Sequence, residues 1–427
     1  MNTKRLAIIE GVRTPFCKAG SSLARLAPDE LGRIAVNALL TRTGLDPALV
    51  DEVIFGCVSQ PADAANVARV IALRAGIPER VPAFTVHRNC ASGCEALSQA
   101  FDKALAGRGS VFIVGGTESM SQIPLLFSQR AAEKFSRLAR AKTLGQKLRA
   151  AASFRPADFK PRVGLMLGLT DPVCGMNMGE TAELLAREFG ITRAEQDAFA
   201  VESHRKAVAA EGRLSSEICP VYLPDGSVIK QDNGPRTDQS VEVLAGLKPV
   251  FDRKHGTVTA GNASQITDGA VALLVMTEER AAQLGFKPLG FIAACTYAGC
   301  DPARMGLGPV FAMAKVEAEA GLTVANADLV EINEAFAAQV LAVLKAMESE
   351  KFARKMLGRA TPLGVVPLER LNVNGGAIAL GHPVGATGAR LVLTALKELA
   401  RREGKRALVS LCVGGGQGAA IWLERNV

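Results

Sequence analysis

A cysteine precedes a predicted helix in Asn89-Cys90-Ala-Ser-Gly93, where its position suits nucleophilic chemistry. Unpaired backbone N–H groups and the positive end of a helix dipole favour a thiolate, and small neighbours let a substrate approach the sulfur. A free thiol with a pKa of ~8.5 is only a few per cent ionised at neutral pH, so such a placement matters. Taken alone, Cys90 fits a small buried hydrophobic residue equally well.

Two further segments carry groups that can move protons. His382 lies in Gly381-His382-Pro383-Val-Gly385-Ala-Thr-Gly388, a flexible loop ahead of a predicted helix, where a base can approach a ligand closely. Cys412 ends a strand in Cys412-Val-Gly-Gly-Gly416, a turn whose backbone N–H groups can form an oxyanion hole. A second thiol there can give a proton to a carbanion. Each residue also has a purely structural interpretation.

Together, Cys90, His382 and Cys412 predict nucleophilic thiol chemistry. The residues alone leave hydrolysis and group transfer equally open. A redox or metal protein using Cys90 and Cys94 is another alternative, although the four histidines are too scattered to suggest a metal site.

The segments around these residues predict an α/β fold. Strand-like and helix-like stretches alternate through the first 120 residues, and the last 140 repeat the plan of loop, helix, strand and glycine turn. This self-similarity indicates two similar halves. The predicted elements are strands at 6–10, 53–58, 84–86, 111–114 and 407–411, and helices capped by Asp29, over 64–75, after Cys90, from Thr181, from Thr192 and through 391–399.

The predicted halves are residues 1–120 with 259–284, and 285–427. Residues 121–258 are expected to form an inserted loop domain that acts as a lid. It contains a basic segment, 127–163, with ten Lys or Arg against two acids, which equals the net charge of +8 of the whole chain. Phe127, Phe135, Leu138, Leu144 and Leu148 alternate with these charges and make the segment amphipathic.

Composition narrows the cellular setting. The nine cysteines are an odd number without Cys-x-x-Cys spacing, which favours a reducing compartment over a disulfide framework. Met1–Arg5 lead directly into a strand, so no signal peptide is predicted, and no window reaches the ~18 apolar residues of a spanning helix. A soluble, cytoplasmic protein is expected, and its basic segment suits a peripheral membrane surface, a protein partner, an acidic ligand or plain solvent.

At these residues the chain resembles the thiolase family along its whole length. Six motifs follow in the family's order. Three of them are the segments given above around Cys90, His382 and Cys412. The three others are Gly115-Gly-Thr-Glu-Ser-Met120-Ser, Gly261-Asn-Ala-Ser264 and Asn333-Glu-Ala-Phe336.

The resemblance implies roles for these residues. Cys90 attacks the 3-keto carbon and becomes an acyl-thioester, while His382 accepts its proton and activates the incoming coenzyme A thiol. Cys412 exchanges a proton with the α-carbon of the acetyl-CoA unit. Asn333 holds the thioester oxygen of that unit through a water. The backbone N–H groups of Cys90 and Gly414 form the second oxyanion hole.

The resemblance also implies the surroundings of the site. Ser264, Lys248, Asn177 and Met178 are expected near coenzyme A, which is a cosubstrate, with no bound cofactor and no metal. The implied fold has five layers, α-β-α-β-α, from two similar halves plus the loop domain. A homodimer or homotetramer is implied, and no nucleic-acid partner. His87 and Cys94 match no functional position and are interpreted as structural.

Departures from the family pattern narrow the subtype. Short-chain biosynthetic thiolases usually carry histidine where this chain has Asn177. Thr143-Leu-Gly-Gln146, Arg155-Pro-Ala-Asp-Phe159 and Gly168-Leu-Thr-Asp-Pro172 resemble the thiolase subunit of β-oxidation trifunctional complexes. This favours a degradative enzyme and a hydratase/dehydrogenase partner. One alternative is a short-chain acetoacetyl-CoA thiolase working in the condensing direction. Another is a ketoacyl synthase, which is disfavoured because Cys412 occupies the position where such an enzyme has its second histidine. The third is a non-catalytic acyl-CoA or lipid-binding protein.

Overall fold

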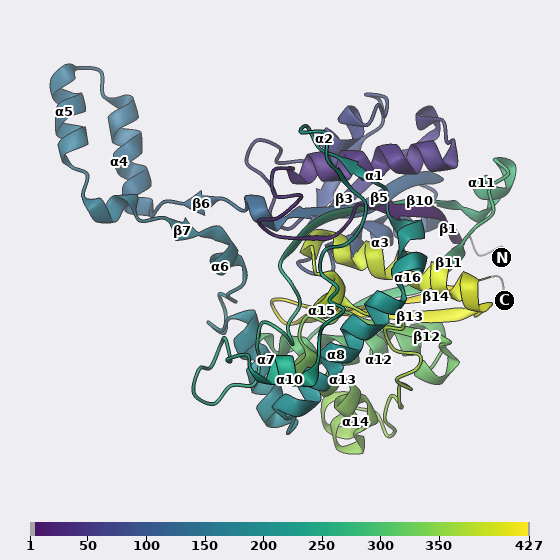
Figure 1. Ribbon diagram of the computed structural model, residues 1–427. Coiled ribbons are helices and arrows are strands. Elements are labelled where there is room, and N and C mark those ends of the chain that lie inside the picture. The colour runs from purple at the N-terminus through teal and green to yellow at the C-terminus, as the bar shows by residue number, and fades with distance from the viewer. Residues whose placement is uncertain (1–4, 426–427) are drawn as a thin grey trace.

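The computed structural model describes residues 5–425, in which helices and sheets are stacked in layers (Figure 1). The predictions made for the N-terminus up to Lys4, and for the last two residues of the second half, lie outside the described residues. One mixed, ten-stranded sheet runs through the body, with a continuous path of nine strands. Their order is β12 (Leu329–Ile332), β13 (Arg406–Val413), β14 (Gln417–Glu424), β11 (Gly290–Gly299), β1 (Leu6–Arg13), β10 (Thr267–Thr277), β5 (Val111–Ser119), β3 (Glu52–Gly56) and β4 (Ala83–Val86); β2 (Cys17–Lys18) pairs with β10.

The two predicted halves meet where β1 pairs with β11. Only the start of β1 takes part, with Leu6 opposite Ile292 and Ile8 opposite Gly290. On one side of this junction β10, β5, β3 and β4 complete the first half, and on the other β14, β13 and β12 complete the second. The junction lets the two halves of the sheet enclose a shared helical layer.

Helices form the three other layers (Figure 1). The outer layer on the first half contains α1 (Pro28–Thr43) and α2 (Val67–Arg74), the central layer contains α3 (Ser92–Leu105) and α16 (Val384–Arg402), and the outer layer on the second half contains α12 (Gly308–Ala320) and α13 (Ala337–Glu348). Helix α16 contacts both halves of the sheet, packing on β5 and β10 and on β12 and β13. A buried apolar cluster fills each interface between layers. The predicted five-layered α/β architecture is confirmed.

Residues 121–258 lie between the two strands β5 and β10 in the chain. Besides the basic segment, this region contains α7 (Met178–Glu188), α8 (Arg193–Ala209), α9 (Glu211–Leu214), α10 (Val241–Ala245), β8 (Val221–Tyr222) and β9 (Val228–Ile229). Thr192 forms the predicted capping box with Glu195 at the start of α8. Outside this region, further short helices are α11 (Glu278–Gln283), α14 (Glu350–Met356) and α15 (Ala377–Leu380).

The basic segment projects from the body as a helical hairpin on a thin stalk (Figure 1). We call residues 125–168 the arm. Its stalk is the ribbon of β6 (Leu125–Leu126) and β7 (Arg162–Val163), its hairpin is α4 (Gln129–Arg140) and α5 (Leu144–Ala152), and it returns to the body through α6 (Gly164–Gly168).

Two predicted helix starts are wrong. Asp29 does not cap α1, because the helix begins at Pro28 after Ala27, and the Asp29 carboxylate instead pairs with Arg74 of α2. Proline suits a first helical position, where its missing N–H costs nothing. Likewise, α7 begins at Met178 and not at Thr181, because Asn177 and Glu180 form a capping box three residues earlier.

A buried ion-pair cluster attaches the loop region to the core. Arg13, at the end of β1 and 1% exposed, donates to Asp232 at 2.6 and 2.8 Å and to Glu217 at 3.2 Å. Thr394 of α16 also donates to Glu217 at 3.0 Å. Breaking such a pair leaves uncompensated charge in the interior, which typically costs ~3–5 kcal/mol.

We expect Arg13→Ala to lower the urea-unfolding midpoint strongly, because Asp232 and Glu217 lose their buried partner. Arg354→Ala is the matched control, since it removes an arginine whose pairing with Glu350 is fully surface-exposed and worth ~0–1 kcal/mol. If Arg13→Ala does not fold, Arg13→Lys should still fold, with a urea-unfolding midpoint below that of the wild type. Equal midpoints for Arg13→Ala and the control would contradict a structural role for the cluster.

Candidate active site

The entrances of α3 and α16 are in backbone contact, which brings Cys90 and His382 to one place. A Cβ atom on Gly93 would lie 2.6 Å from the Ala389 nitrogen, and one on Gly388 would lie 2.5 Å from the Cys94 nitrogen. No side chain fits at either position. Cys90 and His382 each stand two residues ahead of the helix concerned, so this crossing brings together the two chain segments that carry them.

The turn that carries Cys90 is held on both sides. Ser92 accepts a hydrogen bond from the Arg88 N–H at 2.9 Å and donates to the Asn89 carbonyl at 2.7 Å. Asn89 has a φ of 42°, a left-handed conformation that asparagine tolerates better than most residues. Its side-chain amide donates to the Gly414 carbonyl at 2.8 Å, which joins the nucleophile turn to the glycine turn after Cys412.

The acidity of Cys90 differs from the expectation. Burial raises the pKa of the Cys90 thiol above its ordinary value, although the backbone N–H groups of Gly414 and of Cys90 itself point at the sulfur and oppose this. The nearby carboxylate of Glu118 adds to the rise. The prediction of a dipole-stabilised thiolate is therefore wrong for the free enzyme, where Cys90 is a neutral thiol that needs a base.

Two hydrogen bonds orient the His382 ring. Its Nδ1 lies 2.6 Å from the Thr387 hydroxyl oxygen, and the Thr387 hydroxyl donates to the Pro383 carbonyl at 3.0 Å. We therefore assign the proton to Nδ1, which makes Nε2 an acceptor that faces the Asn333 amide nitrogen. Burial, with the nearby Arg390 charge, lowers the pKa of His382 to about 3, so the ring is neutral at physiological pH.

Asn333 faces this ring from the end of β12. Its side-chain nitrogen lies 3.4 Å from His382 Nε2, and its backbone N–H donates to Ser410 of β13 at 3.0 Å. The Asn333 side-chain oxygen is buried without a hydrogen-bond partner among the described residues. A buried amide oxygen of this kind needs a polar partner, such as a water or a substrate group.

Cys412 lies two residues along β13 from Ser410 and is 1% exposed. Burial raises the pKa of its thiol well above the ordinary value, and the negative charge of a Cys90 thiolate nearby adds to this. The two predicted thiols are therefore neighbours, and the thiol of Cys412 is only weakly acidic.

The four residues predicted to lie near coenzyme A have different surroundings in the structure. The Met178 sulfur is 3.4 Å from where a Gly414 Cβ would be, so Met178 covers the glycine turn. The Ser264 N–H donates to Ala335 at 2.9 Å, beside Asn333. Asn177 caps α7, with its side-chain oxygen accepting from the Gly179 N–H at 3.1 Å. Lys248 is exposed at the surface. Cys94 is buried in the helix crossing, as its structural interpretation requires, and His87 is exposed.

Sequence reasoning missed Thr387 and Glu118. Both stand inside quoted motifs, but only the fold reveals that Thr387 sets the tautomer of His382. Glu118 accepts backbone hydrogen bonds from Val58 (3.0 Å), Ser59 (2.8 Å) and Gly385 (2.9 Å), which ties the end of β5 to the start of α16. Burial outweighs these three donors and raises the pKa of Glu118 to about 7.

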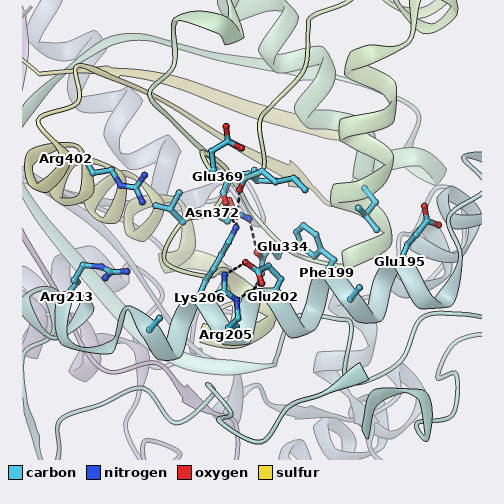
Figure 2. Close-up of a pocket in the computed structure, with 17 residues that line it drawn as sticks. Glu195, Phe199, Glu202, Arg205, Lys206, Arg213, Glu334, Glu369, Asn372 and Arg402 are labelled. Atoms are coloured by element: carbon cyan, nitrogen blue, oxygen red, sulfur yellow. Dashed lines mark hydrogen bonds and ion pairs between the residues drawn. The ribbon is translucent and has the colours of Figure 1, made fainter. Parts of the chain in front are cut away.

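One cavity is lined by Glu334, the neighbour of Asn333, and by none of Cys90, His382 and Cys412. Its volume is about 780 Å³, and residues of α8, α13 and the 368–373 loop line it (Figure 2). Glu334 of its lining follows Asn333 directly and is held by Ser203 at 2.6 Å and Asn372 at 2.9 Å. Lys206, which points across the cavity, donates to the Leu371 carbonyl at 2.8 Å. The polar groups at its floor are thus already paired.

Within residues 5–425, no three His, Cys, Asp or Glu side chains are grouped so as to hold a metal ion. No helix in that range is long and apolar enough to cross a membrane.

The fold is that of a layered α/β enzyme, and two neighbouring cysteines lie at its candidate site. Residues 6–279 match the family "Thiolase, N-terminal domain" and residues 286–425 match "Thiolase, C-terminal domain". The chain therefore belongs to the thiolase family of acyltransferases. The predicted family, fold and enzyme class are confirmed.

Relatives match along nearly the whole chain. A 3-ketoacyl-CoA thiolase of Pectobacterium atrosepticum is 41% identical over 98% of this chain and 96% of its own length. The mitochondrial trifunctional enzyme subunit beta of Mus musculus is 41% identical over 99% of this chain and 89% of its own. Among solved structures, human mitochondrial 3-ketoacyl-CoA thiolase matches with a TM-score of 0.85 at 34% identity, with 100% of both chains covered.

Cys90 should react with iodoacetamide as a weakly acidic thiol. Because burial raises its pKa, the thiolate fraction stays small at neutral pH, and the rate should still be rising at about pH 9. Mass spectrometry of the Cys90 peptide measures the rate, with glutathione as a free-thiol reference. A plateau of this rate below pH 8 would indicate a Cys90 thiolate paired with a protonated His382, and would contradict a neutral Cys90 thiol in the free enzyme.

Proposed function

We propose that the chain catalyses the coenzyme A-dependent cleavage of 3-ketoacyl-CoA to acyl-CoA and acetyl-CoA, with Cys90 as the acyl carrier. The proposal is supported by the meeting of the three chain segments that carry Cys90, His382 and Cys412: the entrances of α3 and α16 are in backbone contact, and Asn89 donates to the Gly414 carbonyl. Degradation in fatty-acid β-oxidation is the favoured direction, which agrees with the names of the relatives, a 3-ketoacyl-CoA thiolase and a trifunctional enzyme subunit beta.

In the first half-reaction, His382 Nε2 takes the proton of Cys90 and the thiolate attacks the 3-keto carbon. The Cys90 and Gly414 N–H groups stabilise the oxyanion. When that intermediate collapses, the carbon–carbon bond breaks and its electron pair enters the thioester enolate of acetyl-CoA. His382 and Asn333 stabilise this enolate, and Cys412 protonates its carbon. The proton on His382 then returns to the Cys412 thiolate.

In the second half-reaction, His382 takes the proton of coenzyme A and the new thiolate attacks the Cys90 thioester. The same two backbone N–H groups hold the oxyanion. The intermediate expels Cys90, which recovers the proton from His382, so every group returns to its starting state.

The coenzyme A position follows from the same geometry. Met178 covers the Gly414 turn and Ser264 adjoins the Asn333 loop, so we assign the pantetheine arm to the space between them. Lys248 and Asn177 lie on the same 121–258 region, which we assign as the lid over coenzyme A between the core halves 1–120 with 259–284 and 285–427. We further propose a cytoplasmic homodimer or homotetramer, with β4 as an open sheet edge.

A short-chain enzyme working in the condensing direction is the second candidate. Its support is the match to an acetyl-CoA acetyltransferase of Bacillus anthracis, with a TM-score of 0.86 at 37% identity over 99% of both chains. Cleavage rates for 3-ketoacyl-CoAs of increasing chain length separate the two: a degradative enzyme accepts medium and long chains, whereas a short-chain enzyme is restricted to acetoacetyl-CoA.

Two cysteine variants should fail at different steps. Cys90→Ser should reduce cleavage by about 10³-fold or more, because a serine hydroxyl has no strong base to ionise it. It should also lose the exchange of labelled coenzyme A with acetyl-CoA. Cys412→Ala should lose cleavage but keep this exchange, since thioester exchange needs no proton transfer at carbon. Equal loss of exchange in both variants would contradict the separate roles.

The arm is a candidate docking element for a hydratase/dehydrogenase partner or for an anionic membrane surface. Its aromatic residues pack mostly within the hairpin, with ring centroids of Phe135 and Phe154 4.9 Å apart. Leu144 and Leu148 of α5 instead point to solvent, 74% and 63% exposed, next to basic side chains. Exposed leucines beside Lys and Arg suit either surface.

Replacing residues 130–160 by a short Gly-Ser linker should preserve acetoacetyl-CoA turnover, because only the β6–β7 ribbon joins the hairpin to the body. Binding to anionic vesicles or to a hydratase/dehydrogenase partner should weaken, as measured by co-sedimentation and by pull-down. The double variant Leu144→Ser/Leu148→Ser is the smaller, folded counterpart. Unchanged binding by both variants would remove the docking role.

A further inference from the structure

The carboxylate of Glu334 is buried beside the site and has no part in the reaction scheme above. Glu334 is 1% exposed and follows Asn333 at the end of β12. Its Oε1 accepts the side-chain amide of Asn372 at 2.9 Å (Figure 2). Its Oε2 accepts the Ser203 hydroxyl at 2.6 Å and the Ile378 N–H at 3.2 Å. Both oxygens therefore bind donors, which come from α8, from α15 and from the loop ahead of α15.

The neighbouring hydrogen bonds determine which groups donate to this carboxylate. The Asn372 amide has one orientation, because its oxygen accepts the Ile332 N–H and its nitrogen donates to the Ile332 carbonyl, both at 2.9 Å. Ser203 accepts the Gly376 N–H at 3.1 Å, so we assign its own hydrogen to the bond with Glu334. Burial raises the pKa of Glu334, and its hydrogen bonds oppose the rise. Since all its partners donate, the ionised carboxylate is the form that satisfies every bond.

Glu334 holds one side of the site through the end of β12. Residues 332–334 are bound at each position: Ile332 by Asn372, the Asn333 N–H by the Ser410 carbonyl at 3.0 Å, and Glu334 by its own carboxylate. A backbone bound at three successive residues has little freedom to rotate. The direction of the Asn333 side chain is therefore set by these bonds.

The same carboxylate holds the segment that carries His382. Helix α15 is a single turn, and only Gly381 separates it from His382. The first turn of α15 is bound to Glu334 through the Ile378 N–H. A Cβ atom on Gly376, the residue before α15, would lie 2.2 Å from the Glu334 carboxyl carbon. The segment therefore packs directly on the carboxyl group, with no room for a side chain between them.

We infer that Glu334 is a positioning residue, which sets the Asn333 amide and the His382 imidazole at their working distance. These two side chains face each other at 3.4 Å. One is next to Glu334 in the chain, and the other follows the helical turn that Glu334 binds. This inference rests on the proposed roles of Asn333 and His382 and adds a residue that acts through both. A displacement of ~1 Å in such a site can cost ~100-fold in rate.

Glu334→Gln is the discriminating variant, because glutamine has the same shape but only one acceptor oxygen. Its amide nitrogen must face a donor, either Asn372 on one side or Ser203 and Ile378 on the other. We expect kcat for acetoacetyl-CoA cleavage to fall by about 10- to 100-fold, with KM for coenzyme A within about twofold, because the displaced groups act in the transition state.

Asp328→Asn is the matched control at the other end of β12. The Asp328 carboxylate uses a single oxygen, Oδ2, which accepts the N–H groups of Lys405 at 2.7 Å and Arg406 at 3.0 Å. An asparagine oxygen can replace it, so kcat and KM should both stay at their wild-type values. A fall in kcat in Asp328→Asn as large as that in Glu334→Gln would overturn the inference.

A second readout does not depend on turnover. The chain has four histidines, so the side-chain ¹⁵N signals of a histidine-labelled sample are few, and His382→Asn identifies the His382 signal by its absence. In Glu334→Gln the His382 Nε2 signal should shift, because the contact with the Asn333 amide changes. The exposed His87 and His255 should keep their signals. A loss of stability alone would leave every signal of the folded protein in place.

If Glu334→Gln does not fold, Ser203→Ala takes its place. It removes the hydroxyl between Glu334 and the Gly376 N–H, and it should show the same two effects at smaller size. A wild-type kcat, or an unshifted His382 signal, in the variant that folds would overturn the inference. Cleavage activity in Cys90→Ser would instead overturn the proposed function, and the His382 signal would still test Glu334 separately.

Discussion

The site depends on a backbone-to-backbone contact between two helices. At the crossing of α3 and α16, Gly93 and Gly388 each face a backbone nitrogen of the other helix, and the space for a side chain is absent. Gly116 of β5 makes a third such approach, to the Gly385 carbonyl. Close-packed interiors deform little, so these contacts fix the helix entrances, and with them the thiol and the imidazole, to within a fraction of an ångström.

Burial then sets the acid–base character of these groups. The interior disfavours charge, so it raises the pKa of both thiols and lowers that of the imidazole, and the resting site is neutral. The two thiols still differ. Cys90 faces the N–H groups of Gly414 and of its own backbone, which stabilise negative charge on its sulfur, whereas Cys412 is more fully buried. One fold thus gives two chemically identical side chains different electrostatic surroundings.

The architecture could be predicted from the sequence because local patterns determine it, and the same patterns single out the candidate site residues. Glycines mark the close approaches, and Cys90, His382 and Cys412 stand beside predicted helix starts or strand ends. The acidity of Cys90 was not predictable, because the helix-dipole argument is local while burial depends on the whole fold. Thr387 and Glu118 were missed for the same reason. Thr387 contacts the His382 ring and Glu118 accepts from the Gly385 N–H at the start of α16, and only the folded structure shows these contacts. The start of α1 was missed because Asp29 resembles a cap but pairs with Arg74.

Charge and chemistry occupy separate parts of the molecule. The arm has its own small core of aromatic rings and its own buried ion pair, Lys134 with Asp158 at 2.5 Å, and it holds the whole net positive charge of the chain. Two connections join the arm to the body: β6 follows the end of β5, and β7 leads through α6 into residues 169–178, whose last residue, Met178, lies against Gly414. The basic charge is therefore held away from the buried thiols and the imidazole.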